Sequence, residues 1–318
     1  MIRVGIIGCG NPRADELLRV LINHPDVDLK WVQDAARAGE RVDRVVRGLV
    51  GECDLVVSAP RDVDDVDVVF LCGSRDKVSS WLGSTTVPDD VRVIDLSGLH
   101  NLNHSADSPW VYGLSEMQRR VLVHDTHLVT VPGSLASAAL LALMPMARNL
   151  LLNSPLELYL AIDENAFADD RTVMDGIPAD AWIRNQQQEV VGALTQCQTG
   201  FNQPVKMTVS RMAESRILSV AACFTSSVDE DKVRQLYEQY YDDHNFVFIV
   251  DRPIVPADVR NTNKCLIRLD KNDRTGQLTV HAVMDLLLKG SSGTAVHMMN
   301  LLFGLHERVG LSLKATGC

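Results

Sequence analysis

The chain opens with MIRVGIIGCGNPRA at positions 1–14, and this stretch decides how the fold is interpreted. Ile2–Gly8 is an apolar run that predicts a buried strand, and residues 17–22 have the apolar spacing of a helix. Between the two lies the pattern GxGxxxA, a glycine-rich turn that either binds a ligand or only reverses the chain. Glycines in such a turn let the backbone approach a pyrophosphate at the helix N-terminus, where N–H groups and the helix dipole favour anions. The predicted dinucleotide-binding loop consists of Gly8, Gly10, Asn11, Arg13 and Ala14.

The rest of the first half continues the alternation of strands and helices. Further short apolar runs follow at 27–33, 66–72, 91–96 and 128–131. Short buried strands with helices between them are typical of a parallel sheet that helices cover on both faces. The fold class predicted for this half is therefore α/β, a parallel sheet of the Rossmann type.

The second half has a different pattern. A long helix is expected over 134–152, and shorter apolar or alternating runs after it predict strands. Helices at about 178–196 and 228–243 separate some of these strands, and a last helix is expected over about 294–302. This order of elements is typical of an α+β domain with a mostly antiparallel sheet.

Composition excludes several classes of protein. The 318 residues include 41 acidic and 31 basic side chains, a net charge of −10, which argues against a general nucleic-acid or anionic-membrane binder. The N-terminus lacks the pattern of a signal peptide, and the longest apolar stretch, 135–146, is too short to span a bilayer. The seven cysteines include no CxxC pair, so we expect reduced, mostly buried thiols, no metal site and a cytoplasmic protein.

Asp34 is the candidate for cofactor discrimination. It ends the second predicted strand, where an acidic side chain accepts the ribose hydroxyls of a dinucleotide and repels a 2′-phosphate. NAD is therefore slightly favoured over NADP, although Arg13 in the loop argues mildly the other way. The alternative is that Asp34 is a solvated loop carboxylate.

Several segments, in chain order, resemble the N-acetyl-γ-glutamyl-phosphate reductase family, within the wider group that includes aspartate-semialdehyde dehydrogenase. The resemblance covers most of the chain, and a dozen ordered matches make it specific. The segments include GIIGCGNPRADELLRVLINHPDVDL, DVVFLC, VIDLSGLHNL, VYGLSEM, PGSLASAALLALMP, NTNKCLI and KGSSGTAVHMMNLLFGLHERVGL.

The resemblance implies an organisation and a chemistry. It implies a dinucleotide-binding domain at 1–133, a substrate and dimerisation domain at 134–293, and a C-terminal helical segment, 294–318, that returns to the first domain. Family members usually form dimers or tetramers, and they reduce an acyl phosphate to an aldehyde with NADPH through a cysteine thioester, while a histidine handles the proton. The same matches place Gly293 and Asn300 near the cofactor.

The chain departs from the family where the chemistry takes place. Ser134 stands where the resemblance expects the nucleophilic cysteine, and the histidine stretch aligns with Ile183-Arg184-Asn185. A serine hydroxyl is a weak nucleophile without an adjacent base, and its ester accepts hydride poorly compared with a thioester. The family's glycine-rich loop becomes the acidic stretch 167–171, and Asp34-Ala35 replaces a serine-arginine pair.

Three hypotheses follow from these departures. The first is an NAD(P)-dependent oxidoreductase with altered chemistry on a small amino-acid-derived substrate, such as an aldehyde, ketone or imine. The second is a non-catalytic regulatory or scaffold paralogue, and the third is the ordinary reductase with a cysteine-to-serine change. All three predict a cytoplasmic homodimer or homotetramer.

The first hypothesis gives Ser134 a role at the active site. It begins a predicted helix whose N-terminal N–H groups are able to hold a carboxylate or an oxyanion; an ordinary N-cap is the alternative. Arg171 and Arg184 are candidates for binding a substrate carboxylate, or else structural ion-pair partners. Glu116, in VYGLSEM, is the third candidate substrate-binding residue.

Overall fold

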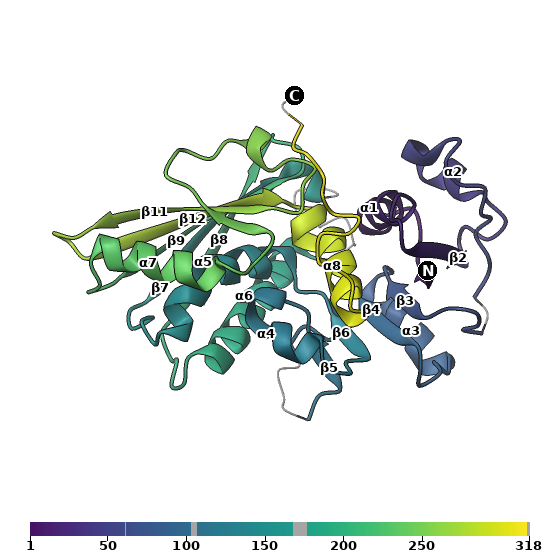
Figure 1. The fold of residues 1–318 in the computed structure, drawn as a ribbon, viewed down its shortest axis with the longest axis horizontal. Coiled ribbons are helices and arrows are strands. Elements are labelled where there is room, and N and C mark those ends of the chain that lie inside the picture. Colours follow the sequence, from purple (N-terminus) through teal and green to yellow (C-terminus); the bar gives the residue numbers. More distant parts are fainter. Residues whose placement is uncertain (61, 103–106, 168–176, 317–318) are drawn as a thin grey trace. The chain divides into compact units, whose positions relative to one another are not determined.

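The computed structural model describes residues 1–60, 62–102, 107–167 and 177–316, which form two compact units (Figure 1). Unit 1 comprises Met1–Pro132 and Ser291–Ser312, and unit 2 comprises Gly133–Gly290 with the described residues after Ser312. The last helix thus belongs to the N-terminal unit, whereas the tail that follows it groups with unit 2.

Unit 1 is built on a six-stranded parallel sheet in the order β2-β1-β3-β4-β6-β5, which confirms the predicted fold class. The strands are β1 (Ile2–Ile7), β2 (Val27–Gln33), β3 (Val68–Leu71), β4 (Arg92–Asp95), β5 (Trp110–Tyr112) and β6 (Leu128–Thr130). The helices are α1 (Pro12–Leu21), α2 (Val42–Val45), η1 (Arg47–Leu49), α3 (Arg75–Ser84), α4 (Ser115–Leu122) and α8 (Gly293–Leu302). Strand β5 has no counterpart among the sequence predictions, because three residues without a long apolar run give no periodic signal.

The strand order reverses at β1, which has β2 on one side and β3 on the other. In sheets of this kind, ligands bind outside the carboxyl ends of the strands where the order reverses. The ends of β1, β2, β3 and β4 therefore mark the place to look for a cofactor and its substrate.

Unit 2 is built on a mixed six-stranded sheet in the order β10-β11-β12-β9-β7-β8. Its three inner pairings are antiparallel and the two pairings at its edges are parallel, so the prediction of a mostly antiparallel sheet is confirmed. The strands are β7 (Leu156–Asp163), β8 (Val205–Met212), β9 (Ile217–Thr225), β10 (Val247–Ile249), β11 (Cys265–Asn272) and β12 (Gln277–Asp285). The helices are α5 (Ser134–Arg148), η2 (Glu164–Ala166), α6 (Ala179–Cys197), α7 (Glu230–Tyr241), η3 (Pro256–Asp258) and a π-helical turn, η4 (Leu288–Ser292), at the junction of the units.

Helix α5 is the core of unit 2, and every residue from Leu135 to Ala147 is buried. It ends at Arg148, four residues before the predicted end, because the chain turns through a positive φ of 58° at Leu150. Pro145 lies inside the helix and has no N–H to offer to the carbonyl of Leu141. The Tyr241 hydroxyl of α7 donates to that carbonyl instead, so the two helices share a hydrogen bond.

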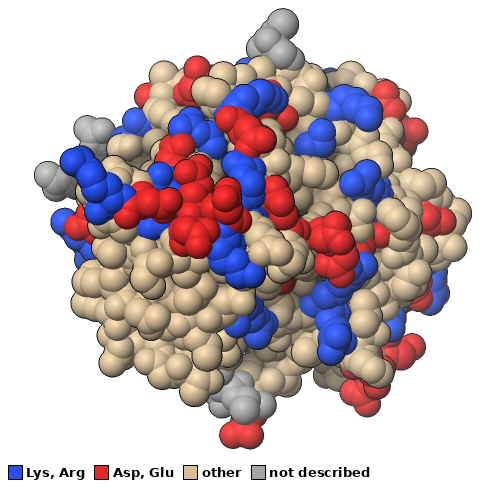
Figure 2. All heavy atoms as spheres, turned by 60° about the vertical axis from the view of Figure 1, so that its left-hand side comes forward, with Lys and Arg blue, Asp and Glu red and all other residues tan. Residues whose placement is uncertain are grey.

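The distribution of charged side chains and the state of the cysteines can be compared with what the composition predicts. Acidic and basic side chains lie next to one another over the upper and right parts of the face in Figure 2, whereas its lower left part shows a broad area without charged side chains. The described cysteines are free thiols and all but Cys223 are buried, as predicted. Across the described ranges, no helix is long and apolar enough to cross a membrane.

Candidate active site

The predicted dinucleotide loop leaves β1 through two glycines at which any side chain would be strained. Gly8 has a φ of 95°, and a Cβ atom there would lie 2.8 Å from the backbone nitrogen of Gly73, at the end of β3. Gly10 has a φ of 72°, and its Cβ would lie 3.1 Å from Val45. Both positions need the left-handed backbone that glycine adopts without strain. The loop is therefore a tight cradle between the carboxyl ends of β1 and β3, the form that a pyrophosphate site requires.

The remaining loop residues shape the start of α1. Asn11 is the N-cap, accepting from the Ala14 N–H at 3.1 Å and donating to the Cys72 carbonyl at 3.2 Å. The carbonyl of Arg13 accepts from the Ser292 hydroxyl at 2.8 Å. Ser292 directly precedes Gly293, the first residue of α8. The C-terminal segment thus joins the dinucleotide loop within unit 1.

Asp34 faces the same loop and is not a solvated carboxylate. It is 8% exposed, accepts from the Cys9 N–H at 3.1 Å and from the Ala36 N–H at 2.9 Å. Each oxygen keeps a further lone pair, because a carboxylate offers about four acceptor sites. Asp34 therefore holds the loop against the end of β2 and still presents acceptor capacity to a ligand.

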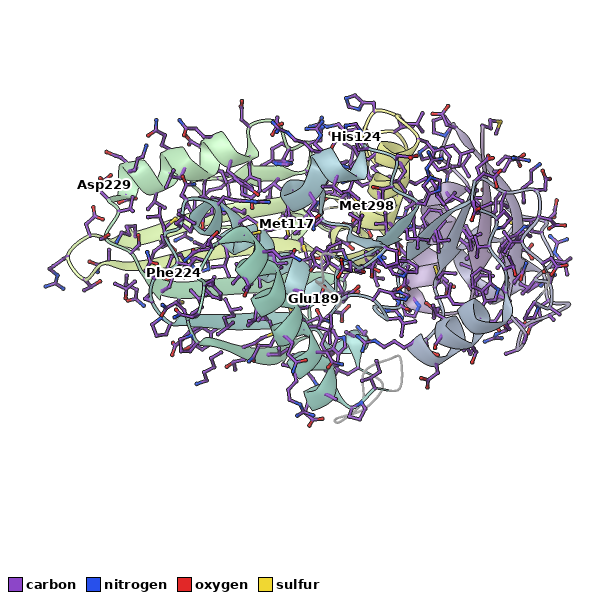
Figure 3. All side chains as sticks on the ribbon, turned by 90° about the horizontal axis from the view of Figure 1, so that it is seen from below. Met117, His124, Glu189, Phe224, Asp229 and Met298 are labelled. Carbon is purple, nitrogen blue, oxygen red and sulfur yellow. The ribbon has the colours of Figure 1, made fainter. Side chains whose placement is uncertain are left out.

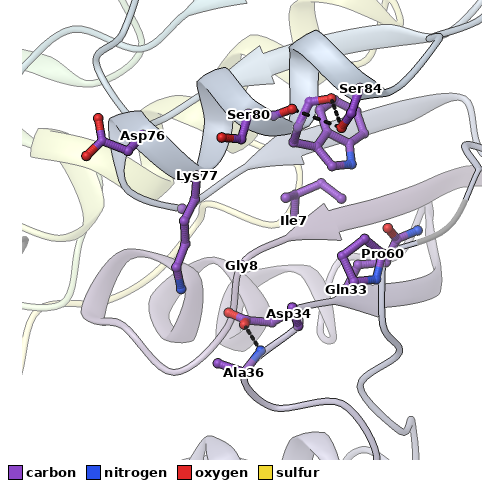
Figure 4. Close-up of a pocket in the computed structure, with 13 residues that line it drawn as sticks. Ile7, Gly8, Gln33, Asp34, Ala36, Pro60, Asp76, Lys77, Ser80 and Ser84 are labelled. Carbon is purple, nitrogen blue, oxygen red and sulfur yellow. Dashed lines mark hydrogen bonds between the residues drawn. The ribbon is translucent and has the colours of Figure 1, made fainter.

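A pocket of about 450 Å³ opens beside Asp34 (Figure 4). Its lining comes from the ends of β1, β2 and β3, from Pro60, and from one side of α3. Lys77 and Trp81 of α3 line it together with Asp34, which gives it a cation, an aromatic ring and a carboxylate. These chemistries fit a nucleoside: a flat base, ribose hydroxyls and nearby phosphate charge.

Asp15 in the first turn of α1 was missed by the sequence analysis. Burial raises the pKa of its carboxyl group to about 6, against the lowering effects of a hydrogen bond from the Gly10 N–H and of the Arg37 guanidinium. The N–H of Gly10 is one of the groups that such a loop offers to a pyrophosphate. A titratable side chain therefore lies at the end of α1 where such a loop offers its N–H groups to an anion.

Ser134 is the first residue of α5, and the start of this helix corrects two expectations. It meets Glu189 of α6, which is labelled in Figure 3. The N-cap is Gly133, so Ser134 itself does not cap the helix. The Gly133 N–H donates to Glu189 Oε1 at 2.8 Å, and the Ala136 N–H donates to Gln186 Oε1 at 3.0 Å. Both acceptors belong to α6 and are buried. Two N–H groups that were expected to hold a substrate anion are thus occupied by the chain's own side chains.

Two other predicted substrate-binding residues are each described within their own unit. Arg184 is 64% exposed on α6 and pairs with Asp180 at 2.7 Å, so it faces solvent rather than Ser134. Glu116 is buried in the first turn of α4 in unit 1, where it accepts from the Ser115 hydroxyl at 2.9 Å. Arg171 lies outside the described residues.

Asn300 has a structural role in unit 1. It is completely buried, its Oδ1 lies 3.0 Å from His24 Nε2, and its Nδ2 donates to the carbonyls of Glu307 and Val309 at 3.1 and 2.8 Å. These bonds fix the segment after α8. Asn300 therefore stabilises the C-terminal segment of unit 1, and its place near the cofactor stays a prediction.

Comparison with known proteins fixes the family. Residues 3–124 match the model of the semialdehyde dehydrogenase NAD-binding domain, and residues 185–285 match that of the semialdehyde dehydrogenase dimerisation domain. An N-acetyl-γ-glutamyl-phosphate reductase of Phocaeicola vulgatus is 37% identical over 326 residues, which cover 99% of each chain. The chain belongs to the N-acetyl-γ-glutamyl-phosphate reductase family. A reductase of the same name from Parabacteroides distasonis is 36% identical, again over 99% of each chain.

Solved semialdehyde dehydrogenases share the fold of this family member. Aspartate semialdehyde dehydrogenase II of Vibrio cholerae, complexed with ASA, superposes with a TM-score of 0.72 at 13% identity, covering 96% of this chain and 98% of that one. The enzyme of Candida albicans, solved with NADP, gives 0.71 at 11% identity, covering 95% and 98%. The family match makes the chain an NAD(P)-dependent type of reductase; a preference between the two cofactors is a separate question.

The structure shows which residues of this chain lie where the N-acetyl-γ-glutamyl-phosphate reductase family has its histidine stretch. The side chains of α6 that meet the start of α5 are Gln186 and Glu189, not Asn185 or Arg184. Gln186 has no proton to exchange near neutral pH. The amide and carboxylate on this face were missed because alignment to a histidine stretch is sensitive to a shift of one residue.

Proposed function

We propose that this protein is a reductase that takes NAD in preference to NADP and reduces a small amino-acid-derived carbonyl compound without a covalent enzyme intermediate. One observation carries the proposal. A serine stands at the start of α5, and two backbone N–H groups at this helix end already donate to Gln186 and Glu189. A nucleophile at this position gains little from the helix, because a buried carboxylate beside it opposes a second negative charge.

The site is still able to orient a substrate without an ionised nucleophile. A serine hydroxyl and a glutamine amide both donate and accept hydrogen bonds, so they are able to orient a carbonyl or an imine. The reduced dinucleotide supplies the hydride, which removes the need for a thioester when the acceptor is already an aldehyde, a ketone or an imine. The family's ordinary acyl-phosphate reduction is the second candidate, and the names of the relatives favour it.

Asp34 supports the cofactor preference. It lines the pocket, and its carboxylate matches the hydroxyls of a ribose and repels a 2′-phosphate. Lys77 lines the same pocket and favours phosphate, so the preference depends on the balance of the two groups. The ratio of the two dissociation constants measures that balance.

The test is a fluorescence titration of the purified protein with NADH and with NADPH. We expect tighter binding of NADH, and loss of the preference in Asp34→Ala. Asp54→Ala is the matched control, because Asp54 is a carboxylate of the same unit, 93% exposed and paired with Arg41. Tighter binding of NADPH by the unaltered protein contradicts the preference, and binding of neither cofactor supports a scaffold protein instead.

The reaction type has its own test. Ser134→Cys is assayed for phosphate-dependent oxidation of N-acetylglutamate semialdehyde, the reverse of the family reaction. We expect the variant to stay inactive, because Gln186 provides no base. Activity in Ser134→Cys that matches a family enzyme contradicts the proposal and restores the ordinary reductase.

A homodimer is also proposed, through the exposed face of the sheet in unit 2. Tyr159, Ala221 and His281 lie side by side on β7, β9 and β12, and they alternate along each strand with buried neighbours. The matched dimerisation domain contains two of these strands, β9 and β12. Light scattering should give twice the chain mass of 35.1 kDa, and a monomer at micromolar concentration contradicts this assignment.

A further inference from the structure

A buried carboxylate and a histidine form a pair in unit 1 at the end of β4. Asp95, the last residue of the strand, is fully buried and accepts from the backbone N–H and the hydroxyl of Ser97 at 2.8 and 2.6 Å through Oδ1. Its Oδ2 lies 2.9 Å from Nδ1 of His100. A carboxylate that is only an acceptor fixes the proton of a neutral imidazole on Nδ1. The second ring nitrogen, Nε2, therefore carries the exchangeable lone pair.

The ring of His100 is held in place without being enclosed. It stacks on Trp110 of β5 with ring centroids 3.8 Å apart and planes 9° apart. Its side chain is 18% exposed, and Nε2 forms no hydrogen bond with any residue that the structure describes. Asp95 thus fixes the Nδ1 edge of the ring and Trp110 fixes one face, and among the described residues none bonds Nε2. This is the arrangement of a carboxylate-oriented proton-transfer histidine.

The position of this pair matches the expected ligand crevice. Strand β4 lies next to β3, and β3 lies next to β1, whose end carries Gly8. Neighbouring strands are about 4.8 Å apart, so the end of β4 is on the order of 10 Å from the dinucleotide loop. The pocket beside Asp34 is lined by residues at the ends of β1, β2 and β3 and on α3, and β4 is the next strand after β3 on the side away from β2. A substrate or the far half of a dinucleotide in the crevice would therefore lie beside His100.

Arg75 adds a cation at the same loop. A Cβ atom on Gly98 would lie 3.4 Å from the Arg75 guanidinium and 3.4 Å from the Asn101 amide. The Nε of Arg75 is buried and has no hydrogen-bond partner in the described part of the chain. A buried guanidinium N–H without a partner is costly unless a ligand satisfies it. A substrate carboxylate is a group that fits this position.

We infer that His100 is the proton donor of the reduction, with Asp95 as its positioning residue and Arg75 as an anchor for an anionic group of the substrate. This inference rests on the proposed function. The donor is the imidazolium form of His100, in which Nε2 has taken a proton from solvent while Nδ1 keeps the proton shared with Asp95. When the carbonyl carbon accepts the hydride, its π bond to oxygen breaks, and the oxygen takes the proton of Nε2 to give an alcohol and a neutral histidine. The histidine is then reprotonated from solvent, and the dinucleotide leaves oxidised.

The first arm of the test needs no turnover. The ¹⁵N chemical shifts of the histidines are compared in the complexes with NADH and with NAD⁺. We expect the Nε2 resonance of His100 to differ between the two complexes, because the oxidised nicotinamide ring carries a positive charge that the reduced ring lacks. His281 of unit 2 is the internal control. Identical His100 resonances in the two complexes overturn the inference.

The second arm measures turnover with succinic semialdehyde as the probe aldehyde. His100→Asn, which keeps a donor toward Asp95, should lower kcat about 100-fold and leave KM and the dissociation constant for NADH within a factor of three. Asp95→Asn should lower kcat as well and alter its pH profile. His127→Asn is the matched control, because His127 pairs with Asp125 near the surface of the same unit.

The outcomes separate this inference from the proposed function. Full kcat in a folded His100→Asn overturns the inference and leaves the reductase intact. Absence of NADH binding by the unaltered protein refutes both. When the cofactor binds but the probe aldehyde is not reduced, the ¹⁵N chemical shift of His100 in the two complexes alone decides, and the melting temperature of His100→Gln shows whether the ring is only structural.

Discussion

Two helix N-termini in this protein hold negative charge, and they do so in different ways. At α5, the carboxylate of Glu189 is 2% exposed and bound to the backbone, so the site is permanently filled. At α1, Asp15 is held more weakly, and its pKa of about 6 lets it become neutral at mildly acidic pH. A helix N-terminus therefore predicts affinity for an anion, but the elements packed against it decide whether that anion is a ligand or a side chain of the protein.

Gly8→Ala should have the largest effect, because it removes the cradle at the start of α1. The new Cβ would lie 2.8 Å from the nitrogen of Gly73 on a backbone with positive φ. We expect the dissociation constant for NADH to rise on the order of 100-fold, since strain of 1–3 kcal/mol adds to a displaced loop. Gly39→Ala is the matched control, with a φ of 90° and no atom within 4 Å of its Cβ. Equal effects of the two substitutions on binding would refute the cradle.

Removing the negative charge of Glu189 should make the N-terminus of α5 more favourable for an anion. In a Ser134→Cys background, Glu189→Gln keeps an acceptor for the Gly133 N–H but removes the carboxylate charge. We expect the thiol pKa to fall by about one pH unit, because a like charge no longer opposes the thiolate. The rate of alkylation by iodoacetamide as a function of pH gives this pKa. An unchanged value would mean that Glu189 does not act on position 134.

The smallest effect is expected at α1 itself. An ionised Asp15 repels a pyrophosphate, so affinity for NADH should be higher below pH 6 and fall severalfold as the pH rises through about 6 to 7.5. Asp15→Asn should remove this dependence and bind as tightly at pH 7.5 as the unaltered protein does at pH 5.5. Titrations at both pH values decide the point, and a pH dependence that persists in Asp15→Asn assigns it to another group.

The local parts of the fold could be predicted from the sequence, and the partners of each site could not. The run Ile2–Gly8 and its glycines contain their own conformational signal, which is why the first strand and loop match the structure. Strand β5 depends on pairing with β6, and three residues are too few to show a pattern. Such an element is visible only once its neighbour is in place.

For the site residues too, the sequence predicts local features but not contact partners. Gln186 and Glu189 are three residues apart and share a face of α6, whereas Arg184 is out of phase and exposed. Knowing which face meets α5 requires the packing of the two helices. His100 was missed for a similar reason, because its significance lies in Asp95 and Trp110, which only the folded sheet brings to it.

Pro145 has a consequence for how unit 2 opens. Because the carbonyl of Leu141 has its donor on α7 rather than on its own helix, α5 completes its backbone ladder only when α7 is docked. The Tyr237 hydroxyl donates to the neighbouring carbonyl of Ala142 at 2.6 Å and adds a second link. The two helices should therefore exchange their amide hydrogens as one cooperative unit, so that loosening α7 also exposes the helix that begins at Ser134.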